Sequence, residues 1–417
     1  MNKLKIFVSA YACEPYKGSE PGIGWNFVNE MAKYHEVHVL TRANNQESIE
    51  KDKVHENLHF HYYDLPKAIA FWKKGKRGYQ LYYYLWQIFI YFNFKNFINT
   101  NNFDIIHHLT FGANWMPSLL MMSKPKTIFG PVGSEDIYKP ILNSLPLKTK
   151  IKEFVRSGVK FFFYYLEPTR WMTIISADKI LNHSSKYALY QYPKFLQHKV
   201  QDHVQTGLNT EEDEYKAFTS KLEKKSTDKI RLIIASELIA WKGVVISSEI
   251  FALIAKERDD VELVILGDGP QKKEMQKIFK TFNVEEKVVF KGFVSKQVLM
   301  QELYEADILL YPAYHHGLAT IILQSMYAYL PIVSMCGDII SDTVESKCGV
   351  VGCGDSMQEI KENFTFKTLE LINSQELRDT LAYKGREMVK NTFEWSQLVK
   401  SMLNVYEDVT NGKVKYE

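Results

Sequence analysis

Short apolar runs alternate with helix-length segments along this chain, and that alternation restricts its fold more than any other feature. The run Lys5–Ala10 is of strand type, and His35–Thr41 alternates between apolar and polar residues with a period of two. A glycine-bearing loop and a helix around Trp25–Lys33 separate the two runs, which gives a β-loop-α-β unit, the usual opening of a parallel sheet. Further strands are predicted at Asp104–Leu109, Thr127–Gly130 and Lys179–Leu181.

The same alternation restarts after residue 228 and predicts a second sheet. A charged stretch rich in Glu and Lys, Thr210–Asp228, separates the two halves. We therefore expect an α/β protein of two doubly wound, Rossmann-like domains, at 1–206 and 207–390, that face an interdomain cleft. Residues 391–417 are expected to pack back on the first domain. Trp395, Leu398, Met402 and Val405 recur at helical spacing, which predicts a helix in this segment. The strands predicted for the second half are Ile230–Ala235, Val261–Leu266, Val288–Phe290, Asp307–Tyr311 and Pro331–Met335.

The composition is that of a folded protein. The 417 residues are 46% hydrophobic and 24% charged, which excludes intrinsic disorder and collagen-like repeats. Four cysteines are too few for a disulfide scaffold, and the first residues lack the apolar region of a signal peptide, so a reducing cytoplasm is the expected compartment.

The two halves of the chain differ in charge. Residues 1–206 carry 26 Lys and Arg against 16 Asp and Glu, whereas the remainder carries 26 Lys and Arg against 33 Asp and Glu. The basic half favours an anionic ligand or an anionic membrane surface.

One apolar segment could be mistaken for a membrane span. Gly78–Phe94 has 17 residues without a charge, but three amides interrupt it and its many tyrosines suit an interface or a buried helix better. A second aromatic and basic stretch lies at Val155–Tyr165. Two interpretations stay open, a packed helix with a solvated basic loop and a surface that contacts an anionic membrane at the inner face. The candidate membrane-contacting residues are Trp72, Lys73, Lys74, Lys76 and Arg77.

Three glycine-containing turns follow predicted strands. In Lys17–Trp25, Gly22 and Gly24 permit close backbone approach before a helix N-terminus that suits an anion, although a plain tight turn is an equal alternative. Lys242 and Gly243 lie between a strand and a helix, where a lysine can hold a diphosphate. Gly267 and Gly269 end the strand Val261–Leu266, and by themselves they indicate a turn.

A fourth motif spans Tyr311–Ser334, where a strand, a small-residue turn, a helix and another strand follow one another. Gln324 lies eight residues after His316. If the helix begins near Leu318, Gln324 is in its second turn and can reach back toward the turn at Gly317.

Other classes of site have weaker support. The pairs His107–His108 and His315–His316 could bind a metal, but neighbouring strand residues point to opposite faces and chelate poorly. Cys348 and Cys353 have no second cysteine pair nearby, which argues against zinc. We therefore expect no metal and no cofactor. The sequence contains no G-x-S-x-G, Walker A or H-E-x-x-H motif and no recognisable nucleic-acid module, so no nucleic acid is expected as a partner.

The order and spacing of these pieces resemble the retaining glycosyltransferases of family 4, which have the GT-B fold. The resemblance covers essentially the whole chain. The segments that are similar to the amino-terminal domain of that family are ACEPYKGSEPGIGW, HEVHVLTR, FDIIHHLTF and GPVG. Those that are similar to its donor-binding domain and closing segment are AWKGV, LGDGP, the Ala306-Asp307 pair, YP, LPIVS and NTFEW.

The resemblance implies roles for individual residues. Lys242 matches the lysine that neutralises the donor diphosphate, and His107 or His108 matches a strand-end histidine near the transferred sugar. The resemblance implies no metal, because Lys, Arg and helix N-termini stabilise the leaving charge. The residues expected to be catalytic are His107, His108, Lys242 and His316. Those expected to bind the donor are Gly22, Gly24, Glu237, Lys242, Gly243, Gly267, Gly269, Gly317, Leu318 and Gln324, and those expected to bind the acceptor are Thr110, Gly130, Gly133 and Glu135.

Two departures from the family pattern stand in the donor site. The family's arginine, five residues before the lysine, is Glu237 here, and its paired glutamates are His316 and Gln324. Gln324 can still hydrogen-bond a ribose hydroxyl, and His316 can donate to a phosphate or a sugar oxygen.

The resemblance implies a retaining hexosyltransferase that moves a sugar from a nucleotide-sugar to a glycan, with a lipid-linked acceptor in capsule, O-antigen or exopolysaccharide synthesis. The expected location is the cytoplasm, on the inner face of the plasma membrane. Two alternatives remain, a GT-B nucleotide-sugar epimerase and a non-catalytic partner that binds a glycan or another transferase.

Overall fold

The computed structural model describes residues 3–53, 55–73, 75, 77–134, 137, 139–145, 147–183, 186–210, 215, 229–314, 318–336, 343–345 and 347–411. The chain divides into two compact units. Unit 1 comprises Met1–Ser134, Ile151–Gly207 and Trp395–Glu417, and unit 2 comprises Glu135–Lys150 and Leu208–Glu394. Residues 135–150, which the sequence-based division placed in the first domain, therefore group with unit 2.

Unit 1 is built on a parallel sheet of seven strands in the order β3-β2-β1-β4-β5-β6-β7. The strand order reverses between β1 and β4, so the loops after these two strands meet at the carboxyl edge of the sheet. The strands are β1 Lys5–Ala10, β2 Glu36–Thr41, β3 Leu58–Tyr62, β4 Ile105–Thr110, β5 Lys126–Val132, β6 Lys179–Asn182 and β7 Val200–Asp202. The helices are α1 Ser19–Ala32, α2 Gln46–Glu50, α3 Lys67–Ala70, α4 Tyr79–Thr100, α7 Pro168–Ser176 and α16 Trp395–Thr410.

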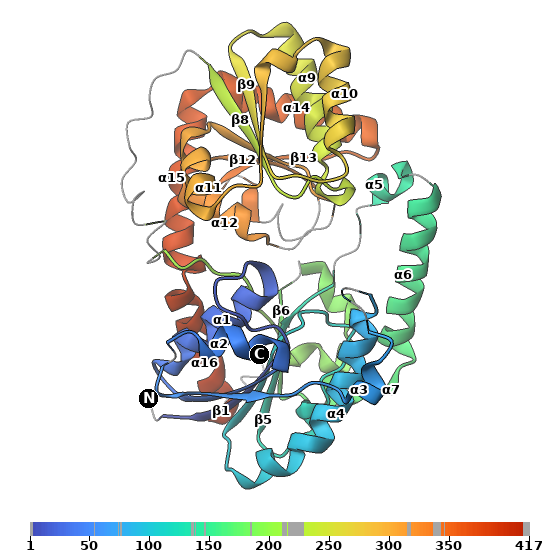
Figure 1. The fold of residues 1–417 in the computed structure, drawn as a ribbon, viewed down its shortest axis with the longest axis vertical. Helices are drawn as coiled ribbons and strands as arrows, with labels where there is room; N and C mark the ends of the chain where they lie inside the picture. Colours follow the sequence, from blue (N-terminus) through green and yellow to red (C-terminus); the bar gives the residue numbers. More distant parts are fainter. Residues whose placement is uncertain are drawn as a thin grey trace. The chain divides into compact units, whose positions relative to one another are not determined.

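Helices cover both faces of this sheet because the strand residues point alternately to the two sides. In β1, Ile6 and Val8 pack in a core with α1 and α16, whereas Phe7 packs in a second core with α4. The apolar face of α16, from Trp395 to Val409, is buried in the first of these cores. The last helix of the chain thus packs against the first one (Figure 1).

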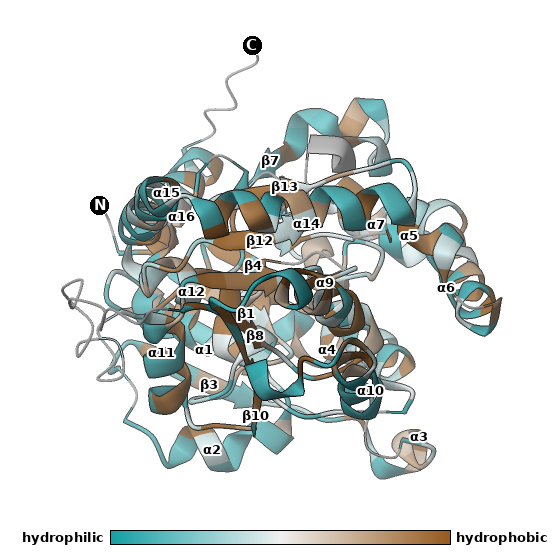
Figure 2. Cartoon of the chain, turned by 90° about the horizontal axis from the view of Figure 1, so that it is seen from above, coloured by the Kyte–Doolittle hydropathy of each residue, from teal (hydrophilic) through white to brown (hydrophobic). Residues whose placement is uncertain are grey.

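Unit 2 has a parallel sheet of six strands in the order β10-β9-β8-β11-β12-β13, which reverses between β8 and β11. Its α9, α10 and α14 pack on one apolar core with alternate residues of the strands. The strand β12 is largely brown in Figure 2, whereas the helices mix teal and brown residues. The strands are β8 Ile230–Ala235, β9 Val261–Leu266, β10 Val288–Gly292, β11 Ile308–Tyr311, β12 Ile332–Met335 and β13 Gly349–Gly352. The helices are α5 Lys139–Ser144, α9 Val244–Glu257, α10 Lys272–Phe282, α11 Lys296–Glu305, α12 Thr320–Tyr327, α14 Met357–Asn373 and α15 Gln375–Met388.

The predicted fold class is confirmed, since both sheets are parallel and each is flanked by helices in a doubly wound arrangement. Ten predicted strands coincide with β1, β2, β4, β5, β6 and β8 to β12 within one or two residues at most ends. Three strands were missed, β3, β7 and β13. β3 carries His59 and His61 at the alternate positions where apolar residues give a strand its signal, and β7 and β13 have only three and four residues.

The apolar segment Gly78–Phe94 lies in the helix α4, which extends to Thr100. It buries one largely apolar face, including Tyr83, Trp86 and Ile90, against the sheet of unit 1. Among the described helices, none has both the length and the apolar character that a membrane crossing requires.

Candidate functional site

The loops after β8 and β11 bring the strongest candidate donor-binding residues together in unit 2. Lys242 lies in the turn between β8 and α9, and its Nζ donates a hydrogen bond to the Tyr311 hydroxyl at 3.2 Å. Tyr311 is the last residue of β11. This pair therefore lies where the strand order reverses, which is the usual ligand-binding position in an open α/β sheet.

Gly243 lets the turn of Lys242 lie against β11. Its φ is +67°, and a Cβ atom there would lie 1.9 Å from the carbonyl oxygen of Pro312. Only glycine fits both the left-handed conformation and this close approach. Helix α9 begins at the next residue, so its free N-terminal N–H groups lie beside the lysine. An ammonium and a helix N-terminus together suit a diphosphate.

Gly267 and Gly269 have a packing role that the sequence motif did not reveal. A Cβ at Gly267 would lie 2.0 Å from the Ser236 carbonyl oxygen, and one at Gly269 would lie 2.5 Å from that of Leu238. The two glycines thus allow the loop after β9 to pack on the loop after β8. Glu237, between the two contacted residues, is exposed at the same edge of the sheet.

The remaining donor candidates are in or near α12. The helix begins at Thr320, so Gln324 lies in its second turn, and Leu318 is buried just before it. Gln324 is also buried, and its Nε2 donates to the Tyr215 hydroxyl at 3.1 Å. His316 and Gly317 lie outside the described residues.

In unit 1 the glycine loop after β1 is held against the end of β4. The Thr110 hydroxyl accepts a hydrogen bond from the Ala12 amide and donates one to the Ala12 carbonyl oxygen, both at 3.0 Å. A Cβ at Gly24 would lie 2.3 Å from that same carbonyl oxygen, and one at Gly22 would lie 2.1 Å from the Lys17 oxygen. Thr110, expected to bind the acceptor, thus already uses its hydroxyl to fix the loop.

Glu20 was missed by the sequence analysis and lies inside the same loop. Its Oε1 accepts a hydrogen bond of 2.5 Å from the Gly112 amide, which links the start of α1 to the turn after β4. Burial raises the pKa of this carboxyl group. The sequence does show an acidic residue within a glycine loop, but its burial in the folded loop could not be predicted from the sequence.

The two histidines of β4 are buried on opposite faces of the sheet. His107 Nδ1 lies 2.7 Å from the Tyr406 hydroxyl, and its Nε2 lies 2.5 Å from the Gly130 carbonyl oxygen. Burial lowers the pKa of His107 to about 3 and that of His108 to about 4. Both nitrogens of His107 therefore have hydrogen-bond partners within unit 1. His108 Nε2 lies 3.3 Å from the Phe111 carbonyl oxygen, and its Nδ1 has no hydrogen-bond partner among the described residues.

The other acceptor candidates lie at the end of β5. Gly130 has a φ of +122°, and a Cβ there would lie 2.3 Å from the Leu181 carbonyl oxygen. Gly133 exchanges backbone hydrogen bonds with Gly112 and Asn114, which joins the turns after β4 and β5. Glu135 lies outside the described residues.

The candidate membrane-contacting residues lie between α3 and α4. Trp72 is half-buried against the core around α4, Arg77 is exposed, and the ammonium of Lys73 lies 5.9 Å from the centre of the Tyr82 ring. Lys74 and Lys76 lie outside the described residues. Trp72 itself therefore contacts the core of unit 1.

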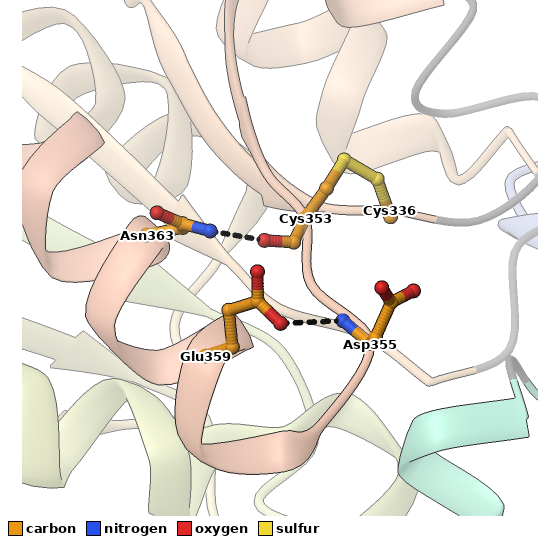
Figure 3. The surroundings of a disulfide bond; sticks show 5 residues. All are labelled: Cys336, Cys353, Asp355, Glu359 and Asn363. Carbon is orange, nitrogen blue, oxygen red and sulfur yellow. Dashed lines mark hydrogen bonds between the residues drawn. A yellow bond between two sulfur atoms is a disulfide. The ribbon is translucent and has the colours of Figure 1, made fainter.

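A disulfide joins Cys336, which follows β12, to Cys353, which follows β13, with their Cα atoms 4.9 Å apart (Figure 3). Asn363 donates to the Cys353 carbonyl oxygen at 2.5 Å, and Glu359 accepts from the Asp355 amide at 2.9 Å, so α14 holds the same loop. The low cysteine count did not point to this bond. Cys13 and Cys348 are free and buried.

Comparisons with known proteins agree with this geometry. Residues 216–388 match the family model described as Glycosyl transferases group 1, which covers most of unit 2. Over 188 residues, 45% of the chain, the sequence is 23% identical to the phosphatidylinositol N-acetylglucosaminyltransferase GPI3 subunit of Saccharomyces cerevisiae. The matched part spans only 41% of the length of that yeast protein.

Solved structures resemble the whole chain. Sucrose-phosphate synthase from Thermosynechococcus elongatus has a TM-score of 0.65 at 12% identity, covering 99% of this chain and 100% of that one. Anabaena HepE, solved in complex with UDP, has a TM-score of 0.60 at 14% identity, covering 97% and 100%. The GT-B fold that the sequence resemblance implied is therefore confirmed, and the sequence similarity to the glycosyl transferases group 1 family lies in residues 216–388.

Proposed function

We propose that this protein is a retaining glycosyltransferase that moves a sugar from a nucleotide-sugar to a hydroxyl group of a glycan. The observation that carries the proposal is the position of Lys242, bonded to Tyr311 where the strand order of unit 2 reverses. The match of residues 216–388 to the group 1 domain supports a donor site in this unit. The complex of UDP with Anabaena HepE makes a uridine nucleotide the first donor class to test.

In the proposed reaction, the acceptor hydroxyl attacks the anomeric carbon on the face from which the diphosphate leaves. The new C–O bond forms as the bond to the diphosphate oxygen breaks, and the diphosphate takes the proton. Lys242 and the first N–H groups of α9 stabilise the charge that develops on the leaving group. No metal is needed for this step, because the ammonium and the helix N-terminus supply the positive charge.

A thermal-shift screen tests the donor site directly. The purified protein is heated with UDP, GDP, ADP, TDP or CMP, and the same series is run on Lys242→Ala. A matched control is Lys256→Ala, which removes an equal charge from the exposed side of α9. At a hundred times its Kd, a nucleotide that binds the native state adds about 2.7 kcal/mol of stability.

One nucleotide is expected to raise the Tm of the native protein and of Lys256→Ala, and to leave Lys242→Ala unshifted. No shift with any nucleotide would contradict the proposal and favour a non-catalytic protein that binds a glycan. That second candidate has its own support in Glu237, a carboxylate at the donor edge, and in Gln324, whose amide is engaged with Tyr215.

We further propose that the acceptor is lipid-linked, as in capsule, O-antigen or exopolysaccharide synthesis. The helix α6, Leu147–Tyr165, supports a site at a membrane surface. Of its 19 described residues, only Lys160 is buried. The residues left exposed include Leu147, Ile151, Phe154, Phe161 and Tyr165, whose spacings of three, four and seven positions place them along one face of the helix.

Helix α6 is therefore turned with its apolar face outward and a lysine inward. It carries five basic residues against one acidic residue, Glu153, which pairs with Arg156. Brown and teal residues alternate along it in Figure 2. An exposed apolar stripe flanked by lysines suits an anionic lipid surface. The yeast relative is named for transfer to phosphatidylinositol, a lipid acceptor, which agrees with this proposal.

A further inference from the structure

Four potential metal ligands lie on one face of the strands β2 and β3, far along the chain from the residues of the proposed donor site. Glu36 and His38 are alternate residues of β2, and His59 and His61 are alternate residues of β3. His38 pairs with His59 in the parallel register, so the two alternating pairs lie side by side. The sequence shows this as E-x-H followed by H-x-H, which the sequence analysis did not single out.

The donor atoms of three of these residues converge. One ligand atom from each of Glu36, His38 and His59 lies within 4.8 Å of the other two. Glu36 Oε1 is 2.9 Å from His38 Nε2, and the rings of His38 and His59 have their centres 4.7 Å apart. A zinc ion bonds nitrogen and oxygen ligands at about 2.0–2.2 Å, which places neighbouring ligand atoms about 3.3–3.5 Å apart. Small side-chain rotations therefore suffice to close the group around one ion.

His61 is positioned to orient His38. Its Nε2 lies 3.1 Å from His38 Nδ1, while His38 Nε2 faces Glu36. With an ion on Nε2, His38 carries its proton on Nδ1 and donates it to His61. Such a second contact fixes the ring and the tautomer of a histidine ligand.

The surrounding side chains hold two of these rings in place. The ring of His38 packs edge-on against Phe103, with centres 5.0 Å apart, and the ring of His61 packs against Phe97 at 5.1 Å. His59 is exposed, so the group is open to solvent on one side. This leaves a path of entry and a place for a water molecule as a further ligand.

We propose that Glu36, His38 and His59 bind a divalent transition-metal ion of the zinc class, with His61 as the positioning residue of His38. Two imidazoles and one carboxylate favour Zn²⁺, Co²⁺, Ni²⁺ or Cu²⁺ over Mg²⁺ or Ca²⁺, which prefer all-oxygen ligands. The ammonium of Lys5 competes with the metal ion for the Glu36 carboxylate, since its Nζ lies 3.4 Å from Glu36 Oε1.

The site has a structural consequence in unit 1. β3 is the edge strand beside β2 among the described strands, and Glu36, His38 and His59 lie in the first three positions of these strands. The proposed donor chemistry lies at the carboxyl edge of a different sheet. A bound ion would therefore cross-link the edge strand to the sheet without taking part in sugar transfer.

The test uses the full chain without a histidine tag and titrates Zn²⁺ against a chromogenic chelator, with the Co²⁺ absorption spectrum as a second readout. The native protein is expected to bind one equivalent, and Co²⁺ is expected to give the intense visible bands of a four-coordinate site. His59→Ala should weaken binding at least 100-fold, and His61→Ala about 10- to 100-fold through the lost positioning contact. Lys5→Met should tighten binding, because it removes the competing ammonium.

His198→Ala is the matched control, since His198 is an exposed histidine of the same unit, and it should bind zinc like the native protein. His59 is itself exposed, so its removal leaves the core intact, and an unchanged Tm without metal verifies this. Native binding that His59→Ala leaves unchanged would overturn the proposal. So would the absence of saturable binding at a one-to-one ratio.

Discussion

The Tyr406 hydroxyl lies 2.7 Å from Nδ1 of His107 and joins the last helix of the chain to the centre of the first sheet. Both groups are fully buried, and the other nitrogen of His107 is bonded to the Gly130 carbonyl oxygen. A strand-end histidine that the sequence assigns to chemistry is here a link between α16, β4 and β5. Its effect should therefore appear in stability and not in sugar transfer.

This burial predicts how the stability of unit 1 depends on pH. The pKa of His107 is lowered to about 3 in the folded protein, against about 6.5 when unfolded. The unfolded chain thus binds the proton first, so the contribution of the neutral ring is complete above pH 6.5 and is lost as the pH falls toward 3. Between pH 7 and 5 the loss is about 2 kcal/mol. In urea unfolding, His107→Gln should show a correspondingly weaker pH dependence, whereas the exposed control His198→Gln should behave like the native protein.

Lys242 and Tyr311 give a graded prediction for catalysis. Lys242→Ala should lower kcat/KM at least 100-fold, since it removes the cation beside the leaving diphosphate. Tyr311→Phe removes only the hydrogen bond that orients the ammonium and should lower kcat/KM about 5-fold, because one hydrogen bond contributes about 1 kcal/mol. Steady-state kinetics with the donor found by thermal shift provides the measurement. Equal activity of Lys242→Ala and Lys256→Ala would refute the assigned role.

Two glycine-to-alanine changes should act in opposite directions. Gly243→Ala places a Cβ 1.9 Å from the Pro312 carbonyl oxygen at a φ of +67°, so it should destabilise unit 2 and weaken nucleotide binding. Gly158→Ala, in the middle of α6, meets no atom within 4 Å and should stabilise by about 1 kcal/mol, because alanine is the better helix former. Urea unfolding of both variants checks the pair, and a neutral Gly243→Ala would contradict the close approach.

The sequence predicted the sheets well because long buried strands carry a strong apolar signal. β8 and β9 have the bounds predicted for them, whereas β3 was missed because its histidines replace the apolar residues of one face. The site was harder to predict. Lys242 could be placed from the turn that contains it, but the burial of His107 depends on Tyr406, 299 residues away along the chain. Such long-range contacts leave no local pattern, and Glu20 and the Cys336–Cys353 bond were overlooked for the same reason.

The outward apolar face of α6 predicts binding to anionic lipid vesicles. Phe154→Glu should weaken sedimentation with vesicles that contain phosphatidylglycerol, because Phe154 is 81% exposed and a carboxylate there opposes both the apolar and the electrostatic attraction. Phe92→Glu is the matched control, since Phe92 is a 71% exposed phenylalanine on α4 of the same unit. A combined change of Lys73, Lys74, Lys76 and Arg77 to Glu tests the second basic segment separately. Binding that survives both changes would exclude these surfaces.

The Cys336–Cys353 bond predicts a redox-dependent stability of unit 2. It closes a loop of 17 residues, and by the loop-entropy relation a bond of that length stabilises by about 3 kcal/mol. Under oxidising conditions, Cys353→Ser should therefore unfold at lower urea than the native protein. With dithiothreitol the two should unfold together, because neither then has the cross-link. Cys348→Ser is the control for loss of a buried thiol, and it should retain the response to dithiothreitol. If the unfolding midpoint of the native protein does not change with dithiothreitol, the bond adds no stability.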